Sequence, residues 1–118
     1  REIGERIGHR ELAYVSSTNL AAICRESGRL DEADTWVEAM GDHAGRSAPP
    51  RLMAEIALER GRCAAARAAG ISGEQADRLL ATARASFLES AQILRKSGRS
   101  DDADQVERYL ADLASSSD

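Results

Sequence analysis

The sequence predicts an all-α chain of about five to six helices arranged as antiparallel hairpins. Composition is the first indication, because alanine, leucine, arginine and glutamate recur throughout the 118 residues and lose little entropy in a helix. The second indication is the placement of the glycines and the 2 prolines, which separate stretches of helical length. The third is self-similarity, in which residues 27–34 (SGRLDEAD) are echoed by residues 97–104 (SGRSDDAD).

Glycine is expected to end the first helices. Residues 1–7 have the pattern of a helix end that stops at Gly8 and His9, so the chain is expected to be a piece of a longer protein. A longer helix should then run from about residue 10 to residue 27. Gly28 suits the left-handed conformation that ends many helices.

The next helix is expected over about residues 30–43. Asp31 and Glu32 fall in its first turn, where negative charge complements the exposed backbone amides. Its apolar residues share one stripe, which consists of Leu30, Ala33, Trp36, Val37, Met40 and Ala44. The position of Trp36 on this stripe favours packing, although a lone indole also suits docking onto a neighbouring surface.

A third helix is expected over about residues 50–69. Pro49 and Pro50 precede it, and proline is tolerated at a helix start because its missing N–H has no partner there. Gly61 marks either a turn or a weak point within this helix.

The last two helices follow a clear break at residues 70–73. Ser72 and Gln75 match a capping box for a helix that continues to about Ser97, after which Gly98 stops it. Ser100 can cap the final helix. The apolar stripes of these two helices are Leu80, Ala83, Phe87, Ala91 and Leu94, and then Ala103, Val106, Leu110 and Leu113.

The repeated pattern resembles the tetratricopeptide repeat family, in which a large and a small residue precede a turn glycine and an alanine follows it. The first copy offers Leu20, Ala21, Cys24, Gly28, Ala33, Val37 and Met40, and the last offers Phe87, Ala91, Leu94, Gly98, Ala103 and Leu110. A weaker middle copy lies at Arg60-Gly61-Arg62 with Ala66. The resemblance implies an α-solenoid segment, a single domain over 1–118 with approximate repeats 10–46, 47–83 and 84–115. An ordinary unrepeated helical bundle remains the alternative.

The same resemblance implies a ligand groove lined by the first helices of successive hairpins. The residues that would line it are Thr18, Asn19, Ala22, Arg25, Arg51, Glu55, Gln92, Arg95 and Lys96. Asn19 stands where the resemblance implies an amide that clamps a peptide backbone. A solvated polar face explains these residues equally well.

Several kinds of chemistry are not expected. The net charge of −4, with arginines interleaved among acids, argues against nucleic-acid binding. His9 and His43 lack neighbouring ligands at metal spacing, and Cys24 and Cys63 are read as buried reduced thiols. There is no catalytic constellation, so we expect no enzyme activity, no metal and no cofactor. No apolar run approaches a membrane span, and a cytoplasmic location is expected.

The sequence therefore predicts a module that binds a protein or peptide. The resemblance extends to repeat regions of large bacterial transcription regulators and signalling ATPases, which implies a place within a larger regulatory protein. Two alternatives stay open. One is a structural segment that caps a helical solenoid or forms a homodimer, and the other is a helical domain accessory to an enzyme.

Overall fold

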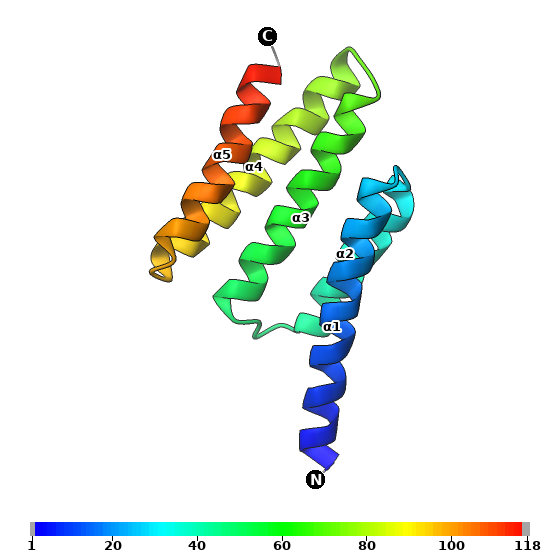
Figure 1. The fold of residues 1–118 in the computed structure, drawn as a ribbon, viewed down its shortest axis with the longest axis vertical. Coiled ribbons are helices and arrows are strands. Elements are labelled where there is room, and N and C mark those ends of the chain that lie inside the picture. The colour runs from blue at the N-terminus through cyan, green and yellow to red at the C-terminus, as the bar shows by residue number, and fades with distance from the viewer. Residues whose placement is uncertain (1, 117–118) are drawn as a thin grey trace. The chain divides into compact units, whose positions relative to one another are not determined.

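The computed structural model describes the backbone of residues 2–116 and the side chains of residues 9–114. These residues form five α-helices, which are α1 (Glu2–Glu26), α2 (Leu30–Ala44), α3 (Pro50–Ala69), α4 (Glu74–Lys96) and α5 (Ser100–Ser116) (Figure 1). The predicted all-α class is thus confirmed for the described residues. The bounds expected for the helices at 30–43 and 50–69 agree closely with α2 and α3, and Pro50 is the first residue of α3.

The chain was predicted to be a single domain over 1–118. Its residue contacts group it into two compact units, Arg1–Ala48 and Pro49–Asp118. In the first unit α1 packs against α2. In the second unit α4 lies between α3 and α5 and packs against both (Figure 1). Because each pair is antiparallel, α3 and α5 run in the same direction and begin at the same end of this unit.

Each unit has a core made largely of alanine and a few bulky side chains. The buried residues of the first unit are Tyr14, Ser17, Ala21, Cys24, Ala33, Val37 and Met40. In the second unit the central cluster is Ala54, Ala64, Ala83, Phe87, Ala91, Leu94, Ala103, Val106 and Leu113. Most members of the predicted stripes are therefore buried, whereas Leu30, Trp36, Ala44, Leu80 and Leu110 are partly exposed. Both cysteines are buried, as predicted, and no disulfide joins them.

The turn after α1 and the turn after α4 have the same hydrogen-bond geometry. Gly28 and Gly98 adopt φ of 80° and 77°. The next residue in each turn, Arg29 or Arg99, donates its N–H to the carbonyl of Cys24 or Leu94 at 2.8 Å in both cases. This is the Schellman arrangement, in which a left-handed residue lets the chain satisfy the last helix carbonyls. The sequence echo therefore corresponds to a local structural repeat.

Replacing Gly98 by alanine should lower the free energy of unfolding by about 1–2 kcal/mol, because an L-residue is strained in the left-handed conformation. Gly98→Asn should cost less, since asparagine tolerates that conformation better. Gly70→Ala is the control, because Gly70 has a right-handed φ of −94°. Urea unfolding followed by circular dichroism measures all three, and an equal loss at both glycines would contradict the assigned strain.

Two predicted helix boundaries are wrong. Gly8 and His9 do not interrupt α1, because an isolated glycine costs a helix only about 1 kcal/mol and the flanking residues favour helix. Ser72 does not cap α4. The residue before α4 is Gly73, which has φ of 79° and makes no side-chain cap, and its carbonyl accepts the N–H of Asp77 at 3.1 Å. The turn at Gly73 leaves Ser72 one residue too early to act as the cap.

Gly61 is not a turn, because α3 continues through it. It lies instead where α3 and α4 approach closely. A Cβ atom added at Gly61 would lie 2.7 Å from Cε1 of Phe87 and 3.2 Å from the Ala83 carbonyl oxygen. The middle copy proposed at Arg60-Gly61-Arg62 thus lacks the turn of the other two copies. The expected repeat boundary between residues 83 and 84 likewise falls within α4.

Candidate binding groove

A groove of about 340 Å³ opens on the second unit between α3 and α5, with α4 as its floor. The residues that line it are Arg51, Ala54, Glu55, Leu58, Ser90, Leu94, Arg99, Asp102, Gln105, Val106 and Tyr109. All of them belong to one unit, so the groove is a property of that unit alone. Its volume is near the lower end of the range of about 300–1,000 Å³ that is usual for ligand pockets.

Small and apolar side chains form the floor. Ser90 is fully buried, and its hydroxyl donates a 2.8 Å hydrogen bond to the Ala54 carbonyl, which ties α4 to α3. Leu94 and Val106 are buried beside it, and Leu58 is partly exposed. Because the one polar group of this floor already has a partner, the floor favours apolar groups of a ligand.

Ion pairs lie on both rims. Arg51 pairs with Glu55 at 3.2 Å on α3, and Arg99 pairs with Asp102 at 3.5 Å at the start of α5. All four side chains remain about 40–60% exposed, so water screens these pairs and they contribute little to stability. The charged side chains on the rims can therefore exchange their ion-pair partners for polar groups of a ligand at a small cost in free energy.

Aromatic packing defines the other end of the groove. Tyr109 stacks on Phe87 with ring centroids 5.8 Å apart, and the guanidinium carbon of Arg62 lies 5.0 Å from the centroid of Tyr109. Arg62 is also 3.9 Å from the carboxylate of Glu59. These contacts join α3, α4 and α5 around Tyr109, beside the groove.

The nine residues predicted to line a groove are distributed over both units. Thr18, Asn19, Ala22 and Arg25 lie on α1 in the first unit. The hydroxyl of Thr18 donates to the carbonyl of Tyr14 at 2.9 Å, Asn19 is exposed, and Ala22 and Arg25 are partly exposed. The remaining five lie on α3 and α4 in the second unit.

The structure brings only two of those five, Arg51 and Glu55, to the groove. Gln92 and Lys96 are exposed elsewhere on α4. Arg95 donates to Glu107 at 3.1 Å and to Asp104 at 3.0 Å on α5, and these hydrogen bonds raise the pKa of its guanidinium. Arg95 thus links α4 to α5 on the outside of the hairpin.

Sequence reasoning missed the groove residues Ser90, Arg99, Gln105 and Tyr109. Ser90 was detectable, because it interrupts the apolar stripe of Phe87, Ala91 and Leu94 with a small hydroxyl at helical spacing. Arg99, Gln105 and Tyr109 were not detectable from the sequence, because their convergence on the groove depends on the register of three packed helices.

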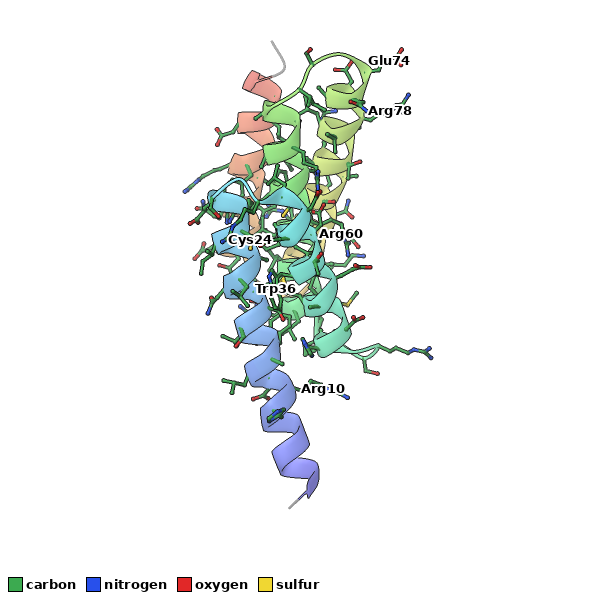
Figure 2. The ribbon with its side chains drawn as sticks, turned by 90° about the vertical axis from the view of Figure 1, so that its right-hand side faces the viewer. Arg10, Cys24, Trp36, Arg60, Glu74 and Arg78 are labelled. Carbon is green, nitrogen blue, oxygen red and sulfur yellow. The ribbon has the colours of Figure 1, made fainter. Side chains whose placement is uncertain are left out.

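The described residues show few other candidates for chemistry. Among them, no three histidine, cysteine, aspartate or glutamate side chains gather closely enough to hold a metal ion. No helix in this part of the chain is both long enough and apolar enough to cross a membrane. Figure 2 shows Glu74 and Arg78 one turn apart at the start of α4, where they form an exposed ion pair of 3.7 Å.

In comparisons with known proteins, no family model, no curated protein and no solved structure matches this chain.

Proposed function

We propose that this chain is a helical interaction module whose second unit binds a peptide segment of a partner protein. The single observation that carries this proposal is the groove between α3 and α5, with its apolar floor and exposed ion pairs on both rims. A floor of this size accommodates a few apolar side chains, and the rims suit the polar groups of a peptide backbone. The sequence pattern that resembles tetratricopeptide repeats supports the same class of function. The module would then be part of a larger bacterial regulatory protein.

Gln105→Trp should weaken peptide binding by about tenfold or more, because an indole at this position fills the groove. Gln105 is exposed, and its side-chain oxygen accepts only a surface hydrogen bond from Arg108, so the fold should tolerate the change. Gln92→Trp is the matched control, since Gln92 is also an exposed glutamine but lies on α4 and does not line the groove. We expect its effect to be less than about twofold.

The experiment begins with a displayed library of random peptides selected on the immobilised chain. The dissociation constants of an enriched peptide are then measured by calorimetry for the unmodified chain and both tryptophan variants, whose folding is checked by circular dichroism. Weaker binding to Gln105→Trp alone supports the groove. Failure to enrich any peptide, or binding that only Gln92→Trp weakens, would overturn the proposal.

A further inference from the structure

The groove on the second unit differs between its two ends. α3 and α5 begin at the same end of this unit, and the ion pairs Arg51–Glu55 and Arg99–Asp102 lie near that end (Figure 1). The lining residues farther along the two helices carry no charge, and they are Leu58, Gln105, Val106 and Tyr109. A ligand that lies along the groove therefore meets charged side chains at one end and apolar and aromatic ones at the other.

Both ion pairs also point in the same direction along the groove. On α3 Arg51 precedes Glu55, and on α5 Arg99 precedes Asp102, while the two helices run in parallel. The positive end of each pair is therefore directed toward the start of its helix, and the negative end toward the uncharged part of the groove. The backbone dipoles at the two helix starts have the same direction. The four side-chain charges sum to zero, but together they form a dipole along the groove.

This order of charges does not serve the helices themselves. Within a helix, the better order places the acid one turn before the base, because it also complements the helix dipole. Glu74 and Arg78 have that better order at the start of α4, outside the groove (Figure 2). Arg29 and Glu32 in the first unit have the opposite order, so the order alone does not mark a site. What distinguishes the second unit is that two such pairs line one groove.

The size of the groove favours an extended peptide over a helical one. Its lining residues extend over about 10 Å of α3 and about 15 Å of α5, at 1.5 Å for each helical residue. A helix is about 10 Å across, so a 10 Å length of it takes up about 800 Å³. The groove, at about 340 Å³, is too small for that. An extended segment of about five residues covers roughly 13 Å and matches the length of the groove.

We infer that the peptide recognised by the groove is an extended segment with an acidic, a basic and an apolar residue at alternate positions, in that order from the charged end. The inference rests on the peptide-binding function proposed above and specifies its ligand. Its basis is charge complementarity, since a ligand ion pair that lies antiparallel to two parallel rim pairs is attracted by both.

The spacing of the rim charges explains the alternate positions. In an extended chain, side chains two residues apart lie on the same side and about 7 Å apart. Arg51 and Glu55 are separated by about 6 Å along α3. The acidic side chain can therefore lie between Arg51 and Arg99 while the basic one lies between Glu55 and Asp102. The apolar side chain, two residues farther on, then reaches the uncharged end of the groove.

Four short synthetic peptides with blocked ends test this order. The first is GSESKSLSG, and the second, GSKSESLSG, exchanges its acid and base. The other two are the same sequences reversed, because the backbone can run in either direction along the groove. All four have one composition and no net charge. In ¹⁵N–¹H NMR titrations of the full chain, the peptide with lysine in the middle should bind at least about fivefold more tightly than its exchanged partner in one of the two directions.

Exchanging the charges of the rims should alter this preference. Arg99→Asp with Asp102→Arg makes the two rim dipoles oppose each other, so the preference should fall below about twofold. Adding Arg51→Glu with Glu55→Arg reverses both dipoles, and the exchanged peptide should then bind more tightly. Each variant keeps an ion pair on both helices, and circular dichroism checks its folding.

Two controls separate the groove charges from other electrostatic effects. Glu74→Arg with Arg78→Glu exchanges an exposed ion pair that does not line the groove, so it should leave the preference unchanged. Sodium chloride at about 1 M shortens the screening length to about 3 Å, so it should reduce the preference in the unmodified chain to less than about twofold.

The outcomes distinguish this inference from the function on which it rests. Equal affinities within both peptide pairs would overturn the charge order, while the proposed function would stand if a library peptide still bound and Gln105→Trp weakened it. Failure of every peptide to bind, the library peptides included, would overturn both. A preference that survives the exchange on α5, or that the Glu74 and Arg78 exchange removes, would place its origin outside the groove and contradict the inference.

Discussion

Phe87→Ala should lower the free energy of unfolding of the second unit by about 3–5 kcal/mol. Only 2% of the surface of Phe87 on α4 is exposed. Its ring stacks on Tyr109 of α5 and lies next to Gly61 of α3, so Phe87 links all three helices of this unit. Truncation removes the apolar contacts and leaves a cavity that the helices cannot close, because the surrounding residues are mostly alanines. Urea unfolding followed by circular dichroism measures the loss.

Leu88→Ala provides the control for that experiment. Leu88 follows Phe87 on α4 but has 45% of its surface exposed, so its truncation removes few contacts and should cost less than about 1 kcal/mol. Comparable losses in the two variants would contradict the packing around Phe87. So would a loss below about 1 kcal/mol in Phe87→Ala, which falls outside the range for fully buried aromatic side chains.

Gly61→Ala should destabilise the second unit by about 1–3 kcal/mol, which is opposite in sign to the usual effect of this substitution. In an open helix interior, alanine is favoured over glycine by about 1 kcal/mol. At Gly61 the new methyl group would lie 2.7 Å from Phe87, whose buried ring has little room to move, and 3.2 Å from a backbone carbonyl. The steric cost therefore exceeds the gain in helix propensity.

Gly41→Ala is the matched control, because Gly41 lies within α2 and a Cβ there has nothing within 4 Å. It should stabilise the first unit by about 0.5–1 kcal/mol. The single tryptophan, Trp36, lies in that unit, and its fluorescence reports unfolding there (Figure 2). Stabilisation by both alanines would contradict the close approach of α3 to α4.

A double mutant tests the proposed clash directly. Phe87→Leu removes the ring atoms that the new methyl group would meet, so Gly61→Ala should cost less in that background than in the unmodified chain. The coupling should be about 0.5–3 kcal/mol, as is usual for residues in contact. Additive losses would show that Gly61 is constrained by something other than Phe87.

The sequence was informative where local rules decide the structure. The bounds of α2 and α3 follow from apolar spacing, from proline at the start of α3 and from Gly28 before α2. The buried stripes of α4 and α5 follow from the same spacing. Gly98 ends α4 in the left-handed conformation, as expected for glycine after a helix.

Prediction failed where tertiary context decides. Gly61 looks like a punctuation residue in the sequence, but the structure uses its small size for helix packing. Gly8 is read the same way, yet α1 continues through it. At the start of α4, the backbone conformation of Gly73 prevents a cap that Ser72 and its sequence spacing suggest. A single sequence does not distinguish these uses of glycine.

The groove was predictable only in part. Arg51 and Glu55 were expected to lie on a ligand surface, and they do line the groove on the second unit. The expected position of the last hairpin placed Gln92 and Lys96 there instead of Gln105 and Tyr109. The difference arises because α4 forms the floor through Ser90 and Leu94 and carries Gln92 and Lys96 on its exposed side.

The central claim is that a partner peptide binds in the groove between α3 and α5. The most direct test is a two-dimensional ¹⁵N–¹H NMR titration of the chain with a peptide enriched from the displayed library. We predict that the largest shift changes fall on the amides of Leu58, Ser90 and Gln105, with little change on α2. Shifts concentrated on α2, or on the outward face of α4 around Gln92, would contradict the account.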